Sequence, residues 1–140
     1  MEDKFKGLSY GEVWEMLDEC QNLDEKIEIY QKMVELGEGL IPDDLDLYAA
    51  PMDNLASCYM KRNEYAKAVP LLERALLLYR IQEFNDSDFT YQRCYALKKL
   101  VKCQKELGNK TLAILYEHEL RLLEATSEIL TNESDTETSR

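Results

Sequence analysis

The stretch from Asn54 to Leu76 reads NLASCYMKRNEYAKAVPLLERAL and decides the fold. Its apolar residues recur every three or four positions on both sides of Asn63, the spacing of one buried face on each of two helices. Asn63 tolerates the left-handed conformation that ends a helix. The stretch therefore predicts two helices joined by a short turn, and helices joined in this way pack as an antiparallel hairpin.

The chain repeats this pattern on both sides of the stretch. A shift of 45 residues aligns Leu55 with Leu100, Cys58 with Cys103, Asn63 with Gly108 and Ala68 with Ala113. A shift of 42 residues in the other direction aligns Leu55 with Val13 and Leu72 with Tyr30. Each helix pair alone would expose an apolar face, so we expect three stacked pairs.

The central unit resembles a tetratricopeptide repeat, most closely the longer-helix repeats of kinesin light chain. Leu55, Ala56 and Tyr59 occupy the large, small and aromatic places of the family's first helix. The places of its second helix are taken by Tyr65, Ala68, Leu72 and Ala75. The resemblance implies an all-α fold, an α–α superhelix of about three hairpins whose first helices line a concave groove.

The outer units depart from the family pattern at the small place of the first helix. The first unit has Trp14 there, and the third unit has Val101. Terminal repeats are often atypical because one of their sides faces water.

Six helices are predicted from their start and stop signals. Ser9 and Glu12 form a capping-box pattern before the first helix, and Asn22 precedes the second, which Gly37 or Gly39 ends. The third helix reaches Arg62, and Pro51 within it marks either a kink or the true start. The fourth helix spans about residues 64–82, with Pro70 near its start. The polar segment 85–88 predicts a turn, Gly108 stops the fifth helix, and the sixth covers about residues 109–130.

We divide the chain into three parts. Residues 1–8 are an N-terminal extension, and residues 9–130 form the helical repeat domain. Residues 131–140 contain no apolar side chain and predict a disordered acidic Ser/Thr tail, because such a segment cannot offset the entropy of ordering.

Composition excludes several classes of function. The 140 residues carry a net charge of −11, which repels phosphate backbones and argues against nucleic acid as a partner. No apolar run is long enough to span a membrane or to form a signal peptide. The four cysteines form no C-x-x-C pair and fall mostly among apolar residues, so we expect reduced thiols and a cytoplasmic protein.

Nothing in the sequence predicts an enzyme, a cofactor or a metal site. The single histidine, His118, lies in a helical segment without a visible nucleophile beside it. No glycine-rich phosphate loop occurs. The Asp pairs at residues 43–46 and 86–88 lack the Gly and the distal Glu of a calcium loop, so helix capping is their expected role.

A basic stripe is the candidate binding site. Lys98, Lys102 and Lys105 are spaced i, i+4 and i+7 and share one helix face. The resemblance implies that the groove presents Asn54, Lys61, Tyr95, Lys98, Lys99, Lys102 and Lys105. Some members of the family grip a terminal carboxylate, for which Asn54, Lys98 and Lys102 are the nearest equivalents. The alternative is that these lysines pair with the acidic first unit or are simply solvated; the first 48 residues hold fourteen acids and four lysines.

The sequence therefore predicts a non-catalytic protein-interaction module, an adaptor or scaffold that binds a protein or peptide segment of acidic character in its groove. A second interpretation stays open, in which exposed apolar end faces pair and the protein is a self-associating homodimer.

Overall fold

A computed structural model describes residues 3–38, 46–84 and 89–138, with the side chains of residues 46–47, 82–84 and 127–138 left out. These residues form helices and turns and contain no β-strand, which confirms the predicted all-α class. The elements are α1 (Tyr10–Glu15), the 3-10 helix η1 (Met16–Glu19), α2 (Leu23–Glu38), α3 (Asp46–Lys61), α4 (Tyr65–Phe84), α5 (Thr90–Glu106) and α6 (Lys110–Thr138).

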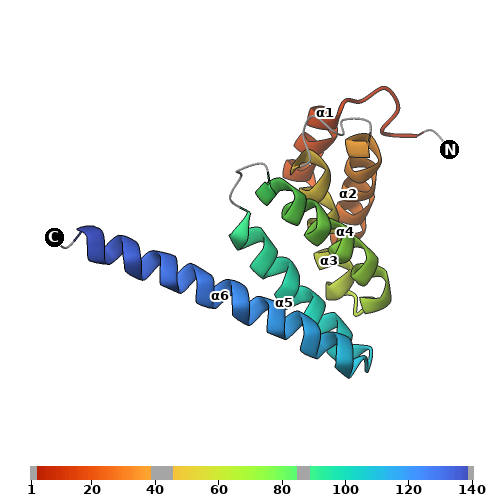
Figure 1. The fold of residues 1–140 in the computed structure, drawn as a ribbon. Coiled ribbons are helices and arrows are strands. Elements are labelled where there is room, and N and C mark those ends of the chain that lie inside the picture. The colour runs from red at the N-terminus through yellow and green to blue at the C-terminus, as the bar shows by residue number, and fades with distance from the viewer. Residues whose placement is uncertain (1–2, 39–45, 85–88, 139–140) are drawn as a thin grey trace.

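Consecutive helices lie side by side along the molecule. Each helix packs against the next in sequence, and α3 also packs against α5. Figure 1 shows α1 and α2 at one end, α3 and α4 in the middle, and α5 and α6 at the other end. The C-terminal half of α6 extends away from the other helices (Figure 1).

The predicted helix starts are present. The Ser9 side chain accepts a hydrogen bond from the Glu12 N–H, and the Glu12 carboxylate accepts one from the Ser9 N–H, which completes the capping box. Asn22 caps α2, because its Oδ1 accepts a hydrogen bond of 2.9 Å from the Glu25 N–H. Local side-chain chemistry thus defines both helix starts of the first hairpin.

The turns of the second and third hairpins share two backbone hydrogen bonds, displaced by 45 residues. Asn63 and Gly108 both adopt positive φ, at 61° and 79°. The N–H groups of Glu64 and Asn109, which follow them, reach back five residues to carbonyls, at 2.9 and 2.8 Å. The repeat seen in the sequence is therefore a repeat of backbone geometry at these two turns.

The largest part of the core lies where α3, α4 and α5 meet. Ala56, Ala68 and Ala75 are fully buried there, as the repeat pattern predicts for small residues that allow helices to approach closely. Large side chains fill the remaining space: Met52, Leu72, Leu76, Leu97 and Leu100. The half-buried Tyr59 and Tyr65 pack against this cluster.

Charged side chains join α6 to the two helices before it. Glu119 of α6 pairs with Arg80 of α4, whose Nε lies 3.1 Å from its carboxylate, and with Arg93 of α5 at 3.5 Å. Because Glu119 is partly covered, these pairs lose less to solvent screening than fully exposed ones.

Several predicted boundaries differ from the structure. Helix α3 begins at Asp46, so Pro51 lies inside the helix and does not start it. At the sixth helical position Pro51 removes only one intrahelical hydrogen bond, since the first four N–H groups have no helical partner. Helix α2 continues through Gly37 to Glu38, so Gly37 does not end it. Gly39, residues 42–45 of the acidic loop and the predicted turn at residues 85–88 lie outside the described residues.

The two predicted terminal segments differ in how they relate to the helices. Phe5 and Leu8 of the N-terminal extension pack against the apolar cluster of the first hairpin around Val13. Helix α6 continues to Thr138, so the predicted boundary of the tail at residue 131 falls inside a helix. Residues 131–138 contain no Gly or Pro that would stop α6 at that boundary.

Two glycines provide a test of the turn geometry. A Cβ at Gly108 meets no atom within 4 Å, but the positive φ strains any L-residue, so Gly108→Ala should lower the free energy of unfolding by about 1 kcal/mol. Gly11 lies inside α1 in equally open space, and Gly11→Ala should raise that free energy by up to about 1 kcal/mol. Urea denaturation measures both changes. A stabilising Gly108→Ala would contradict the left-handed turn.

Candidate functional site

The predicted lysine stripe on α5 faces carboxylates of α6. The Lys105 ammonium lies 2.7 Å from the Glu117 carboxylate, and the Lys98 ammonium lies 3.9 Å from that of Glu124. Lys98 also sits over the ring of Tyr95, 5.7 Å from its centre. Lys102 is exposed between them. Two of the three stripe lysines thus have carboxylate partners within their own hairpin.

Lys99 points in another direction, toward α3. Its ammonium binds the Asp53 carboxylate, which also accepts a hydrogen bond of 3.3 Å from the Tyr79 hydroxyl. Asp53 is only 9% exposed, and a carboxylate at such a position requires a compensating charge. The ion pair of Lys99 with Asp53 therefore joins α5 to α3.

The 45-residue repeat explains where the lysine stripe lies. It aligns Asp53 with Lys98 and Tyr79 with Glu124. The contact of Asp53 with Tyr79 in the second hairpin is thus equivalent to the contact of Lys98 with Glu124 in the third. Asp53 is covered by α5, whereas no described helix covers Lys98. The lysine stripe is therefore on the face to which a following hairpin would pack.

At two positions of this end face, α6 has charged residues where the preceding hairpin has apolar ones. Glu117 and Arg121 stand where the preceding hairpin buries Leu72 and Leu76. A polar outer face is what ends a stack of repeats, since apolar side chains there would be left in water.

The other predicted site residues are exposed, but they are distributed over two helices. Tyr95 of α5 is 46% exposed and meets Tyr91 edge to face, with ring centres 4.8 Å apart. Asn54 and Lys61 are exposed on α3 and lie seven residues apart on one helix face. The seven predicted residues lie on the neighbouring helices α3 and α5, and binding of an acidic segment by the lysines stays a prediction.

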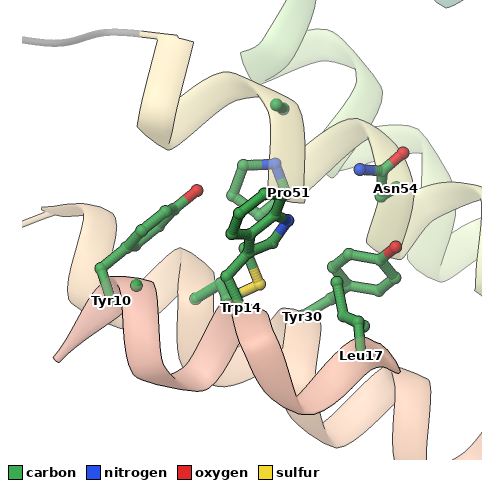
Figure 2. Close-up of a pocket in the computed structure, with 9 residues that line it drawn as sticks. Tyr10, Trp14, Leu17, Tyr30, Pro51 and Asn54 are labelled. Atoms are coloured by element: carbon green, nitrogen blue, oxygen red, sulfur yellow. The ribbon is translucent and has the colours of Figure 1, made fainter. Parts of the chain in front are cut away.

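A pocket that the sequence did not predict opens between α1, α2 and α3. It encloses about 390 Å³, within the range of about 300–1,000 Å³ typical of ligand sites. The residues that line it are Tyr10, Gly11, Trp14, Leu17, Tyr30, Met33, Ala50, Pro51 and Asn54. Figure 2 shows the Trp14 side chain rising from α1 toward Pro51 of α3, with Tyr30 from α2 beside it.

The pocket exists because α1 stays apart from α3. The backbone of α3 packs against α5, whereas that of α1 comes close only to α2 and η1 among the described residues. Trp14 aligns with Ala56, which is fully buried in the second hairpin. A tryptophan cannot occupy the space of an alanine between closely packed helices, so Trp14 remains 59% exposed beside an open gap.

The signal that could have revealed the pocket was present in the sequence. Trp14 stood at the small place of the repeat, which is a local conflict with the packing of a regular hairpin. Such conflicts between pattern and packing concentrate at functional sites.

The segment of α1 and η1 beside the pocket is acidic, although none of its carboxylates belongs to the residues that line the pocket. Helix α1 and η1 carry Glu12, Glu15, Asp18 and Glu19 and no basic residue. In the described part of the chain, no ion pair involves these four carboxylates. By contrast, acidic groups elsewhere in the first hairpin are paired: Asp24 with Arg62, Glu28 with Lys4 and Glu35 with Lys32.

The remaining reactive side chains do not gather at the pocket. No disulfide joins the four cysteines, all of which the structure describes, and burial raises the pKa of the Cys58 and Cys103 thiols, which keeps them protonated. His118 is exposed on α6. Among the described residues, no three His, Cys, Asp or Glu side chains come together as a metal site would require. None of the helices described here has the length and apolar character of a membrane span.

These features define an all-helical protein of consecutive hairpins with a side pocket of mainly apolar character. No protein-family model, curated protein or solved structure matches the chain. The resemblance to tetratricopeptide repeats therefore stays a prediction that depends on the residues of Asn54–Leu76.

The pKa of the Tyr116 hydroxyl on α6 reports on its environment, and a pH titration measures it. Burial raises its pKa to about 12, together with the charge of Glu73 and the 3.1 Å hydrogen bond to its carboxylate. Because the folded-state pKa exceeds the unfolded value of about 10, the protonated hydroxyl stabilises the fold below pH 10, and this contribution is lost as the pH rises toward 12.

Glu73→Gln keeps an acceptor oxygen and removes the charge. We expect the pKa of Tyr116 to fall in this variant, seen as an earlier rise of tyrosinate absorbance, with Tyr116→Phe identifying the band. The loss of stability between about pH 10 and 12 should also become smaller. An unchanged titration in Glu73→Gln would show that Glu73 does not set this pKa.

Proposed function

We propose that the chain is a non-catalytic protein-interaction module, an adaptor or scaffold that holds a segment of a partner protein in the pocket between α1 and α3. The observation that carries this proposal is Trp14, a tryptophan 59% exposed in a concave, mainly apolar pocket. Tryptophan is among the residues that contribute most to protein–protein binding, especially when a partner covers it completely.

The chemistry of the pocket favours binding over catalysis. Its polar side-chain groups are the hydroxyls of Tyr10 and Tyr30, the amide of Asn54 and the indole N–H of Trp14. Among the described residues that line it, none has a carboxylate, imidazole or thiol that could transfer a proton or attack a substrate. Hydroxyls and amides at the rim of an apolar pocket orient a bound peptide by hydrogen bonds.

The proposal includes a tetratricopeptide-like superhelix, in which α1, α3 and α5 are the first helices of three stacked hairpins and line its inner side. The matching turns at Asn63 and Gly108 and the packing of α3 against α5 support this arrangement. Asn54 then belongs to the same inner side as the pocket, which agrees with its predicted role. The absence of a disulfide among the four cysteines, all of them in the described part of the chain, supports a cytoplasmic location.

Affinity purification with two matched alanine variants tests the proposal. Trp14→Ala should release a partner that the wild-type protein retains, because losing a central tryptophan typically weakens binding by about thirtyfold or more. Leu122→Ala is the control, since Leu122 is 57% exposed on α6, away from the pocket, and its removal should leave the partner bound. Equal retention by wild type and Trp14→Ala would refute a role for the pocket.

A second candidate function is self-association. Exposed leucines on α4 and α6 favour it, because Leu77 and Leu122 occupy equivalent places in two hairpins, and Leu115 lies seven residues before Leu122 on the same face of α6. Two copies could cover these side chains against each other, which would remove apolar surface from water.

Light scattering separates the two functions. The binding proposal expects a monomer of 16.4 kDa. Self-association expects twice that mass, and the double variant Leu115→Glu/Leu122→Glu should then return the protein to the monomer, because charges cannot be buried unpaired at an interface. A dimer that no Trp14-dependent partner accompanies would favour the second function.

A further inference from the structure

We infer that the pocket between α1 and α3 takes a basic peptide segment, in which one large apolar side chain is flanked by Lys or Arg. This inference rests on the proposed function and names the chemistry of the partner. It differs from the acidic partner expected for the lysine stripe on α5.

The apolar part of the occupant follows from the shape of the pocket. Trp14, Leu17 and Met33 form apolar walls, and Pro51 closes the side toward α3 (Figure 2). The volume of about 390 Å³ suffices for one or two large side chains but not for a folded element. An aromatic or branched aliphatic side chain would cover the exposed face of Trp14 and gain the most from burial there.

The charge of the occupant follows from the unpaired carboxylates beside the pocket. Gly11 and Trp14 line it, and Glu15 and Asp18 each follow one of them by four residues, so both acids lie along the same edge of α1 and η1. Neither forms an ion pair within the described residues. A partner with Lys or Arg on this side would therefore gain charge pairing without displacing a salt bridge of the described residues.

Basic groups of the chain lie beyond one end of the pocket. Lys61 follows Asn54 by seven residues, about two helical turns further along α3. Lys26 and Lys61 both lie near Cys58, where their charges partly offset the effect of burial on the pKa of its thiol. The two lysines leave the Trp14 side of the pocket acidic, so the basic residues of the occupant should lie along α1.

The lysines of the stripe on α5 and the carboxylates beside the pocket differ in whether they already form ion pairs, and this difference favours a basic occupant. Lys98, Lys99 and Lys105 already have Glu124, Asp53 and Glu117 as partners. An acidic segment would have to compete with these pairs, whereas a basic segment at the pocket competes with no ion pair in the described part of the chain. Electrostatic complementarity of this kind accelerates association and excludes partners of the wrong sign.

Selection from random peptides tests the inference and requires no natural partner. A display library of random twelve-residue peptides is selected on the full wild-type chain and counter-selected against the full-length Trp14→Ala variant. We expect the surviving sequences to share an aromatic or branched aliphatic residue flanked by Lys or Arg. Survivors enriched in Asp or Glu, or without charge bias, would overturn the basic assignment and leave the pocket as a binding site. The absence of any Trp14-dependent sequence would overturn the proposed function as well.

The tryptophan itself reports binding of a selected peptide, because Trp14 is the only tryptophan in the chain. Titration of the peptide should change its fluorescence, and raising the salt concentration should weaken binding. Glu15→Lys and Asp18→Lys should each weaken binding about three- to tenfold, whereas the matched control Glu106→Lys, exposed at the end of α5, should not. Equal affinities for Glu15→Lys, Asp18→Lys and the control would overturn the charge assignment.

Discussion

Close packing of helices through small side chains is the constraint on which the structure depends. A helical hairpin has apolar residues on more than one face and cannot cover them alone, so it must stack against its neighbours. Ala56, Ala68 and Ala75 are fully buried between α3, α4 and α5, and their size allows these helices to approach each other closely. The matching turns at Asn63 and Gly108 each join the two helices of one hairpin, with the same backbone conformation in both hairpins.

The ends of the molecule differ from its middle because each end meets this constraint in another way. At the C-terminal end, Glu117 and Glu124 stand where the preceding hairpin has Leu72 and Tyr79, and both pair with lysines of α5. At the N-terminal end, Trp14 replaces a small residue and α1 stays apart from α3. The first difference places charged pairs on the outer face of the third hairpin. The second difference leaves the pocket to which we assign the function.

The two ends of the molecule also differ in whether their charged groups form ion pairs. The acidic groups beside Trp14 are unpaired in the described residues, whereas most lysines of α5 are neutralised by the chain itself. The free charge of the protein near its pocket is therefore negative, even though the most evident charge pattern in the sequence is the lysine stripe. Pairing within the fold, more than the number of charges, decides which surface can attract a partner.

The sequence by itself determined the helices, their caps at Ser9 and Asn22, the turns at Asn63 and Gly108 and the buried residues of the central hairpin. These depend on neighbours within a few positions and on apolar periodicity, both of which are visible in one chain. Only the tertiary structure decided which carboxylates neutralise Lys98, Lys99 and Lys105, because ion pairs join residues up to 46 positions apart. It also decided that the large side chain of Trp14 leaves a pocket, since a gap depends on how far two helices can approach one another, and periodicity does not encode that distance.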